Sequence, residues 1–80
     1  MPTYQLAHQH HADECRFAYA AWNGFASPLR HHAALSSCAR GEHRIWWTVE
    51  ADSPEAALSL LPSYLATRCE VDLVSEVLIP

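Results

Sequence analysis

Histidine and cysteine are the residues of this chain whose type and spacing could support chemistry. The 80 residues include six histidines and three cysteines, and His8, His10 and His11 stand close together. Residues two apart on a β-strand point to the same side, with α-carbons about 6.8 Å apart, so His8 and His10 could reach one ion. Neutral imidazole and ionised thiolate suit Zn²⁺, Ni²⁺ or copper. The pattern therefore predicts a transition-metal site.

Hydrophobic periodicity divides the chain into the elements that would position these side chains. Alternation or β-branched and aromatic content predicts strands, and apolar residues three and four apart predict helices. Ser53 and Pro54 form a strong helix start, and Pro62 should interrupt that helix. The predicted strands are 3–10, 30–38, 43–51 and 71–79, with one helix between the first two strands and another between the last two.

The element order is β-α-β-β-α-β, which predicts the α+β class and the ferredoxin-like split βαβ arrangement. Right-handed crossovers then give an antiparallel sheet of strand order 4-1-3-2, with both helices on one face. The length fits a single domain that spans residues 1–80.

This topology is expected to gather side chains from distant parts of the sequence at one end of the sheet. We expect the carboxyl end of the first strand to meet the first turn of the first helix, the start of the second strand and the start of the last strand. His43 and Cys38 are expected near the opposite end. The candidate metal ligands are therefore His8, His10, Cys15, His11 and His31, with Cys69 as a further donor. The outer strand, which carries His31, lies two strand spacings, or about 9–10 Å, from the first strand. His31 could therefore be too far away to bind the same ion as His8 and His10.

Other interpretations of these residues stay open. The histidines could serve a pocket for a small organic ligand, with one of them as general acid or base. They could also be polar residues at a strand end without any chemistry. Cys15 could be a nucleophile whose pKa a helix dipole lowers, or simply the first packed residue of the apolar stripe. Whether the chain is an enzyme is therefore left undecided.

Composition excludes several classes of function. The net charge is −4, and the five cations are all arginines. The chain has no lysine that could form a Schiff base. It also lacks the basic patch that nucleic-acid binding would require. No apolar run approaches the roughly 20 residues of a membrane span, and no signal peptide is evident. We therefore expect a cytoplasmic protein with free thiols and without a membrane partner.

Trp46 predicts a second contact surface. Alternation along 43–51 places Trp46 on the sheet face that the helices leave open, with small apolar neighbours. An exposed tryptophan among such neighbours often marks a buried contact. We therefore expect a homodimer in which two open sheet faces pack together. An interaction module that buries Trp46 against a different protein is a further possibility.

Three stretches of the chain carry a family resemblance. They are His8-x-His10-His11, the block Ala21 to His31, and the run Trp46 to Ala51. The chain resembles small bacterial proteins of the dimeric ferredoxin-like, or α+β barrel, type, and it is distantly similar to a family that includes a small nickel-binding protein. The resemblance implies the ferredoxin-like fold and the dimer, and it adds some weight to metal binding.

The function predicted first is thus a small cytoplasmic homodimer that binds a divalent transition metal (Ni, Zn or Cu) through a His/Cys cluster. The alternative is a dimeric α+β-barrel enzyme or accessory protein that binds a small organic ligand.

Overall fold

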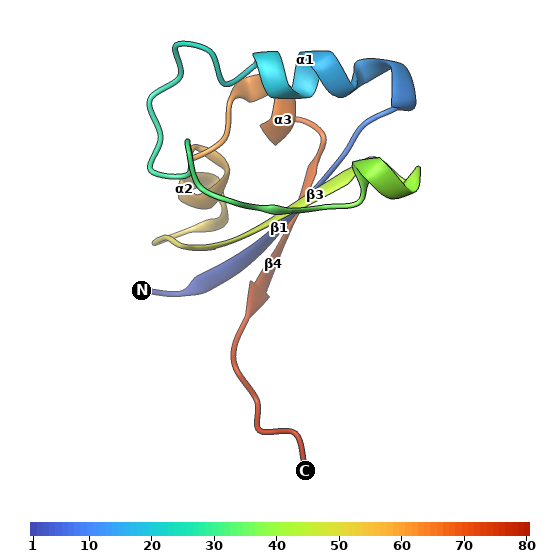
Figure 1. Cartoon of the computed structure of the whole chain (residues 1–80). Coiled ribbons are helices and arrows are strands. Elements are labelled where there is room, and N and C mark those ends of the chain that lie inside the picture. Colours follow the sequence, from blue (N-terminus) through green and yellow to red (C-terminus); the bar gives the residue numbers. More distant parts are fainter.

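A computed structural model describes all 80 residues of the chain. It is a small α+β domain in which short helices alternate with the strands of one sheet (Figure 1). No helix is long and apolar enough to cross a membrane. The elements are β1 (Thr3–Gln9), the 3₁₀ turn η1 (Ala12–Glu14), α1 (Cys15–Ala20), β2 (Leu35–Ser36), the 3₁₀ turn η2 (Cys38–Arg40), β3 (Arg44–Glu50), α2 (Pro54–Leu58), α3 (Ser63–Ala66) and β4 (Cys69–Val74).

The four strands form one antiparallel sheet in the order β2-β3-β1-β4. This is the predicted order 4-1-3-2 read from the other edge, so the predicted strand order is confirmed. The central strands pair along their whole length, from Thr3 opposite Glu50 to Gln9 opposite Arg44. Strand β4 pairs with the other edge of β1, and this pairing places Cys69 opposite His8.

The helices lie on one side of the sheet, and the core forms between the two layers (Figure 1). Alternate residues of β1 and β3 face this core because successive side chains of a strand point to opposite faces. Two buried leucines, Leu6 on β1 and Leu65 on α3, are fully inaccessible to solvent, and so is His8. A buried histidine at the end of an apolar row needs polar partners, and the Leu65 carbonyl oxygen and the His10 ring supply them.

Proline and serine define the second helical region as predicted. The Ser53 side chain accepts a hydrogen bond from the backbone N–H of Ala56 at 3.0 Å, and Pro54 follows at the first helical position. Pro62 has extended backbone and separates α2 from α3. A proline has no N–H to donate and clashes with the preceding turn, so the helix divides at this point.

The outer strand is much shorter than predicted. Residues 30–38 were expected to form it, but β2 comprises only Leu35 and Ser36. Leu35 lies opposite Trp46, so it shares the open face and is 76% exposed, whereas alternation placed it toward the helices. His31 has left-handed backbone with a φ of 69°, which no regular strand accommodates. The predicted orientation of this strand was therefore wrong.

The placement of the sheet ends also differs from the prediction. Because β1 and β3 are antiparallel, the carboxyl end of β1 lies beside the start of β3 and beside the turn that joins β2 to β3. Cys38 and His43 consequently lie next to His10, not at the opposite end. Strand β2 is two antiparallel steps from β1 and runs in the same direction, so its start and the preceding His31 belong to the other end.

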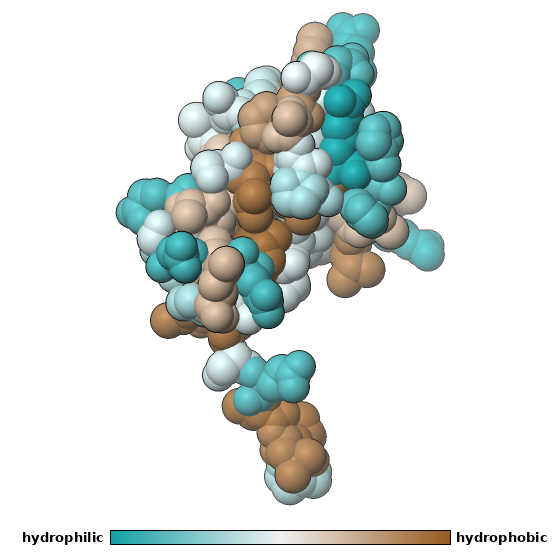
Figure 2. All heavy atoms as spheres, turned by 90° about the vertical axis from the view of Figure 1, so that its left-hand side faces the viewer, coloured by the Kyte–Doolittle hydropathy of each residue, from teal (hydrophilic) through white to brown (hydrophobic).

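The last strand ends earlier than predicted, at Val74 instead of Ile79. Residues 75–80 extend away from the sheet (Figure 1). Their apolar side chains, Val77, Leu78 and Ile79, are at least 75% exposed, and Figure 2 shows them as a brown extension below the domain.

Candidate metal centre

Four side chains from three segments converge at the carboxyl end of β1. They are His10, which follows β1, Cys15 at the start of α1, Cys38 at the start of η2, and His43, which precedes β3. One ligand atom from each residue can be chosen so that all four atoms lie within 4.8 Å of one another. His10 is buried and the other three residues are partly buried.

The distances between the four donor atoms are close to those between the ligands of a tetrahedral metal ion. His10 Nε2 lies 3.2 Å from Cys15 Sγ and 3.5 Å from Cys38 Sγ. His43 Nδ1 lies 3.0 Å from Cys15 Sγ. A tetrahedral ion with bonds of about 2.0–2.3 Å separates its donor atoms by about 3.3–3.8 Å. Small side-chain movements would therefore be enough to place all four donors around one ion.

The backbone of the β2–β3 turn delivers two of these donors. Gly41 ends η2 with a left-handed φ of 91°, and His43 is also left-handed, with a φ of 56°. A non-glycine residue in this region costs about 1–2 kcal/mol, and such residues concentrate at functional sites. The carbonyl oxygen of His43 accepts a hydrogen bond of 3.1 Å from the backbone N–H of His10, which extends the β1–β3 pairing up to the centre.

A chain of hydrogen bonds fixes which nitrogen of His10 faces the centre. His8 Nδ1 lies 3.1 Å from the carbonyl oxygen of Leu65, and a carbonyl can only accept, so Nδ1 of His8 carries the proton. His8 Nε2 therefore has a free lone pair, and His10 Nδ1 donates to it at 3.0 Å. The lone pair of His10 is then on Nε2, which points at Cys15 and Cys38. Metal-bound histidines usually donate their other ring N–H in this way.

Burial favours the neutral form of both rings. The pKa of His8 is lowered mainly by burial, and the nearby His10 lowers it further, although the hydrogen bond to Leu65 opposes the shift. Burial and the neighbouring His43 lower the pKa of His10. Neutral imidazole is the form that binds a metal ion. The lowered pKa values therefore keep His10 able to bind the ion and His8 able to accept the hydrogen bond from His10.

Glu14 holds the start of α1 beside the centre. Its Oε1 accepts a hydrogen bond of 2.9 Å from the backbone N–H of His11, and its Oε2 accepts one of 3.0 Å from the Tyr64 hydroxyl. Arg68 lies 3.9 Å from Oε2. The hydrogen bond from His11, followed by those two neighbours, lowers the pKa of Glu14. Because Cys15 directly follows Glu14, this network positions the Cys15 thiol.

The donor set determines which chemistry fits. Two neutral imidazoles and two thiolates carry a charge of −2, which a divalent ion would neutralise. Four protein donors fill a tetrahedral shell and leave no open position for a substrate, as in structural zinc sites. Burial, and secondarily the Cys38 thiol, raise the pKa of Cys15. An activated nucleophile needs the opposite shift, so the raised pKa argues against a catalytic role for Cys15.

The structure brings only two of the sequence-predicted ligands into the centre. His10 and Cys15 belong to the four-residue centre. His8 stands behind His10, and the exposed His11 lies beside Glu14. Cys69 lies opposite His8 on β4, where burial raises its pKa to about 11. His31 lines a separate pocket.

Sequence reasoning missed Cys38 and His43 as members of the centre. The signal that could have found them is the direction of the strands: in the predicted order, the turn between the second and third strands must lie beside the end of the first strand.

Comparison with known proteins adds no assignment. No protein-family model matches the chain, and neither a curated protein nor a solved structure matches it. The interpretation of the centre therefore depends on its geometry.

Proposed function

We propose that this chain binds one divalent transition metal ion through His10, Cys15, Cys38 and His43. The observation that supports the proposal is the convergence of two imidazoles and two thiols from the end of β1, the start of α1 and the β2–β3 turn. The chain of hydrogen bonds from Leu65 through His8 to His10 supports it, because it directs a lone pair into the centre. Zn²⁺ fits best, since a tetrahedral set of two sulfur and two nitrogen donors suits zinc, whereas Ni²⁺ and Cu²⁺ prefer square-planar sites.

The bound ion would join the end of β1, the start of α1 and the β2–β3 turn. Only 13 of the 80 residues are buried, so the core is small and an ion that links three segments would stabilise the fold. We therefore propose that the ion has a structural role. A protein with such a site could also store or sense the metal if the ion exchanges with solution.

The strand order and the helices on one face support the proposal of a ferredoxin-like fold. A cytoplasmic location fits the proposal as well, because reducing conditions would keep the two thiols available.

Titration with Co²⁺ tests the proposed coordination. Co²⁺ replaces Zn²⁺ in tetrahedral sites and, unlike Zn²⁺, absorbs visible light. We expect one equivalent to give intense visible bands together with a near-ultraviolet thiolate band, and Zn²⁺ to displace them. Cys15→Ser and Cys38→Ser should each remove the thiolate band or weaken it.

Two matched variants control this titration. Cys69→Ser removes the third cysteine, and His32→Ala removes an exposed histidine; neither residue belongs to the centre. Both variants should titrate like the original chain. Weak bands typical of six-coordinate Co²⁺, or equal spectra from all four variants, would contradict the proposed site.

A further inference from the structure

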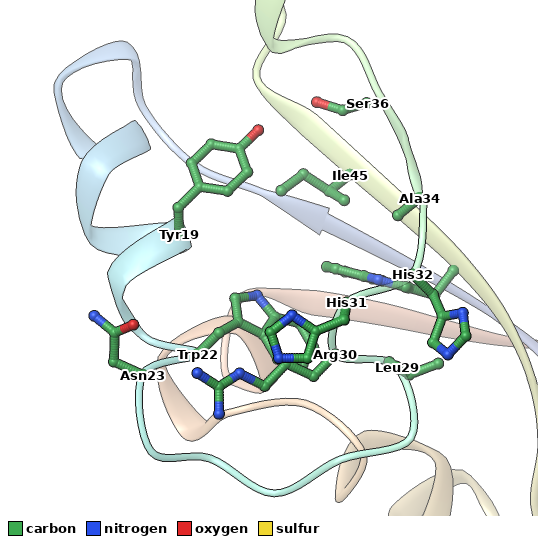
Figure 3. Close-up of a pocket in the computed structure, with 11 residues that line it drawn as sticks. Tyr19, Trp22, Asn23, Leu29, Arg30, His31, His32, Ala34, Ser36 and Ile45 are labelled. Atoms are coloured by element: carbon green, nitrogen blue, oxygen red, sulfur yellow. The ribbon is translucent and has the colours of Figure 1, made fainter.

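A second candidate site lies between α1 and β3, and its Tyr19 side borders Cys38 of the metal centre. It is an open pocket with a volume of about 380 Å³, at the lower end of the range for small-molecule sites (Figure 3). The segment 29–34, which follows the loop after α1, closes one side of it. None of the four residues of the metal centre lines this pocket.

One wall of the pocket is aromatic and apolar. Trp22 and Trp47 form it, with ring centroids 6.0 Å apart and planes at 53°. Ile45 and Leu29 extend the apolar surface. Trp47 and Ile45 are buried members of the core, so this part of the wall is held in place by packing. A flat hydrophobic group would gain contact area and ring-edge interactions here.

The other side of the pocket carries one permanent positive charge, that of Arg30. His31 and His32 follow Arg30 along this side of the pocket (Figure 3). The pocket lining includes no aspartate or glutamate. The chain contains a single ion pair, between Arg68 and Glu14, so Arg30 has no acidic partner within the protein.

The backbone on the Arg30 side of the pocket is strained. His31 has a φ of 69°, one of only two non-glycine residues of the chain in the left-handed region. The other is His43 in the metal centre. The surrounding structure must hold a residue in this strained conformation. Such residues are found most often at functional sites.

We propose that this pocket binds a small aromatic carboxylate, with the ring against Trp22 and Trp47 and the carboxylate on Arg30. A guanidinium offers a planar pair of N–H donors that matches a carboxylate, and Arg30 has such donors free of any acidic neighbour. Tyr19 and Ser36 line the same pocket, and their hydroxyls interact with each other. The limited volume restricts the ligand to one or two rings.

Phenylacetate is a suitable probe, read by the quenching of tryptophan fluorescence. We expect a Kd of about 0.1–1 mM, as a ligand of this size allows. 2-Phenylethanol and 2-phenylethylamine have the same ring and replace the carboxylate by a neutral or a cationic group. Both should bind at least about tenfold more weakly, because they lose the charge-assisted hydrogen bonds.

The matched variants are Arg30→Gln and Arg40→Gln. Arg40 is exposed and lies outside the pocket, so its variant should bind phenylacetate like the original chain. Arg30→Gln should weaken binding at least about tenfold while the circular dichroism spectrum stays unchanged. Equal affinity for the three probes, equal affinity of the two variants, or a Kd weaker than about 10 mM would overturn the proposal. Co²⁺ titration of Arg30→Gln is an independent readout, because this variant should keep the metal site.

Discussion

His8 is not a ligand of the proposed centre, but it determines the orientation of the His10 ring. It is fully buried, and its two ring nitrogens are both engaged, one by the Leu65 carbonyl and one by His10. Such partners of metal ligands fix the tautomer and the angle of the ligand ring. His8 is thus a positioning residue.

Replacement of His8 should weaken metal binding without abolishing it. We expect His8→Ala to lower the affinity for Zn²⁺ by about 10- to 100-fold while one ion still binds per chain, and His8→Gln to recover part of the loss. Competition with a chromogenic chelator measures the affinity, and circular dichroism checks the fold. Unchanged affinity in folded His8→Ala would show that His10 does not need this support.

The two cysteines should make metal binding strongly dependent on pH. The raised pKa of Cys15 means that its thiol is protonated at neutral pH in the absence of metal. Binding must therefore release thiol protons, and two protons would make the affinity for Zn²⁺ fall about 100-fold for each pH unit of acidification. Competition titrations between pH 6 and pH 8 measure this slope. A tenfold or smaller change per unit would indicate that fewer than two thiols coordinate the ion.

At the scale of the elements, the start of α1 depends on Glu14. Its folded-state pKa is lowered, so it stabilises the protein above its ordinary pKa of 4.5, and this contribution disappears as the pH falls through the folded-state value. Glu14→Gln should therefore lower the urea midpoint at pH 7 and leave it unchanged near pH 3. The matched control is Glu55→Gln, because Glu55 is exposed in the first turn of α2. Equal effects of Glu14→Gln at both pH values would contradict this account.

The elements also show how far the sequence determines the fold and the site. The alternation of β1, the Ser53-Pro54 helix start and the break at Pro62 depend on neighbouring residues, so local patterns predict them. The short β2 depends on where the loop after α1 joins the sheet. No local pattern fixes the left-handed turn at His31, and that turn changes which residues face the core.

The candidate site was predictable in part for a related reason. His10 and Cys15 are close in sequence, so a strand followed by a helix brings them together. Cys38 and His43 reach the centre only through the antiparallel direction of β3. The strand order and the antiparallel pairing together place Cys38 and His43 beside the end of β1, so the prediction that they lie at the opposite end was wrong.

At the scale of the whole molecule, the open face of the sheet is the proposed dimer interface. Trp46 is half-buried there, with Arg44 stacked 5.5 Å from its ring centroid and the exposed Leu35 opposite. Buried tryptophans often contribute 2 kcal/mol or more to an interface, roughly a 30-fold change in affinity. We expect sedimentation equilibrium to show a dimer that Trp46→Glu weakens at least about 30-fold. A monomer at all concentrations would exclude this interface.

The metal content of the purified chain shows whether His10, Cys15, Cys38 and His43 hold an ion. The protein should be produced without a histidine tag and its metals measured by mass spectrometry, together with Cys38→Ser and Cys69→Ser. We predict about one Zn²⁺ per chain in the original protein and in Cys69→Ser, and strong loss in Cys38→Ser, which lacks one of the four donors. Trace metal in the original chain, even after incubation with Zn²⁺, or equal metal content in the two variants would contradict the account.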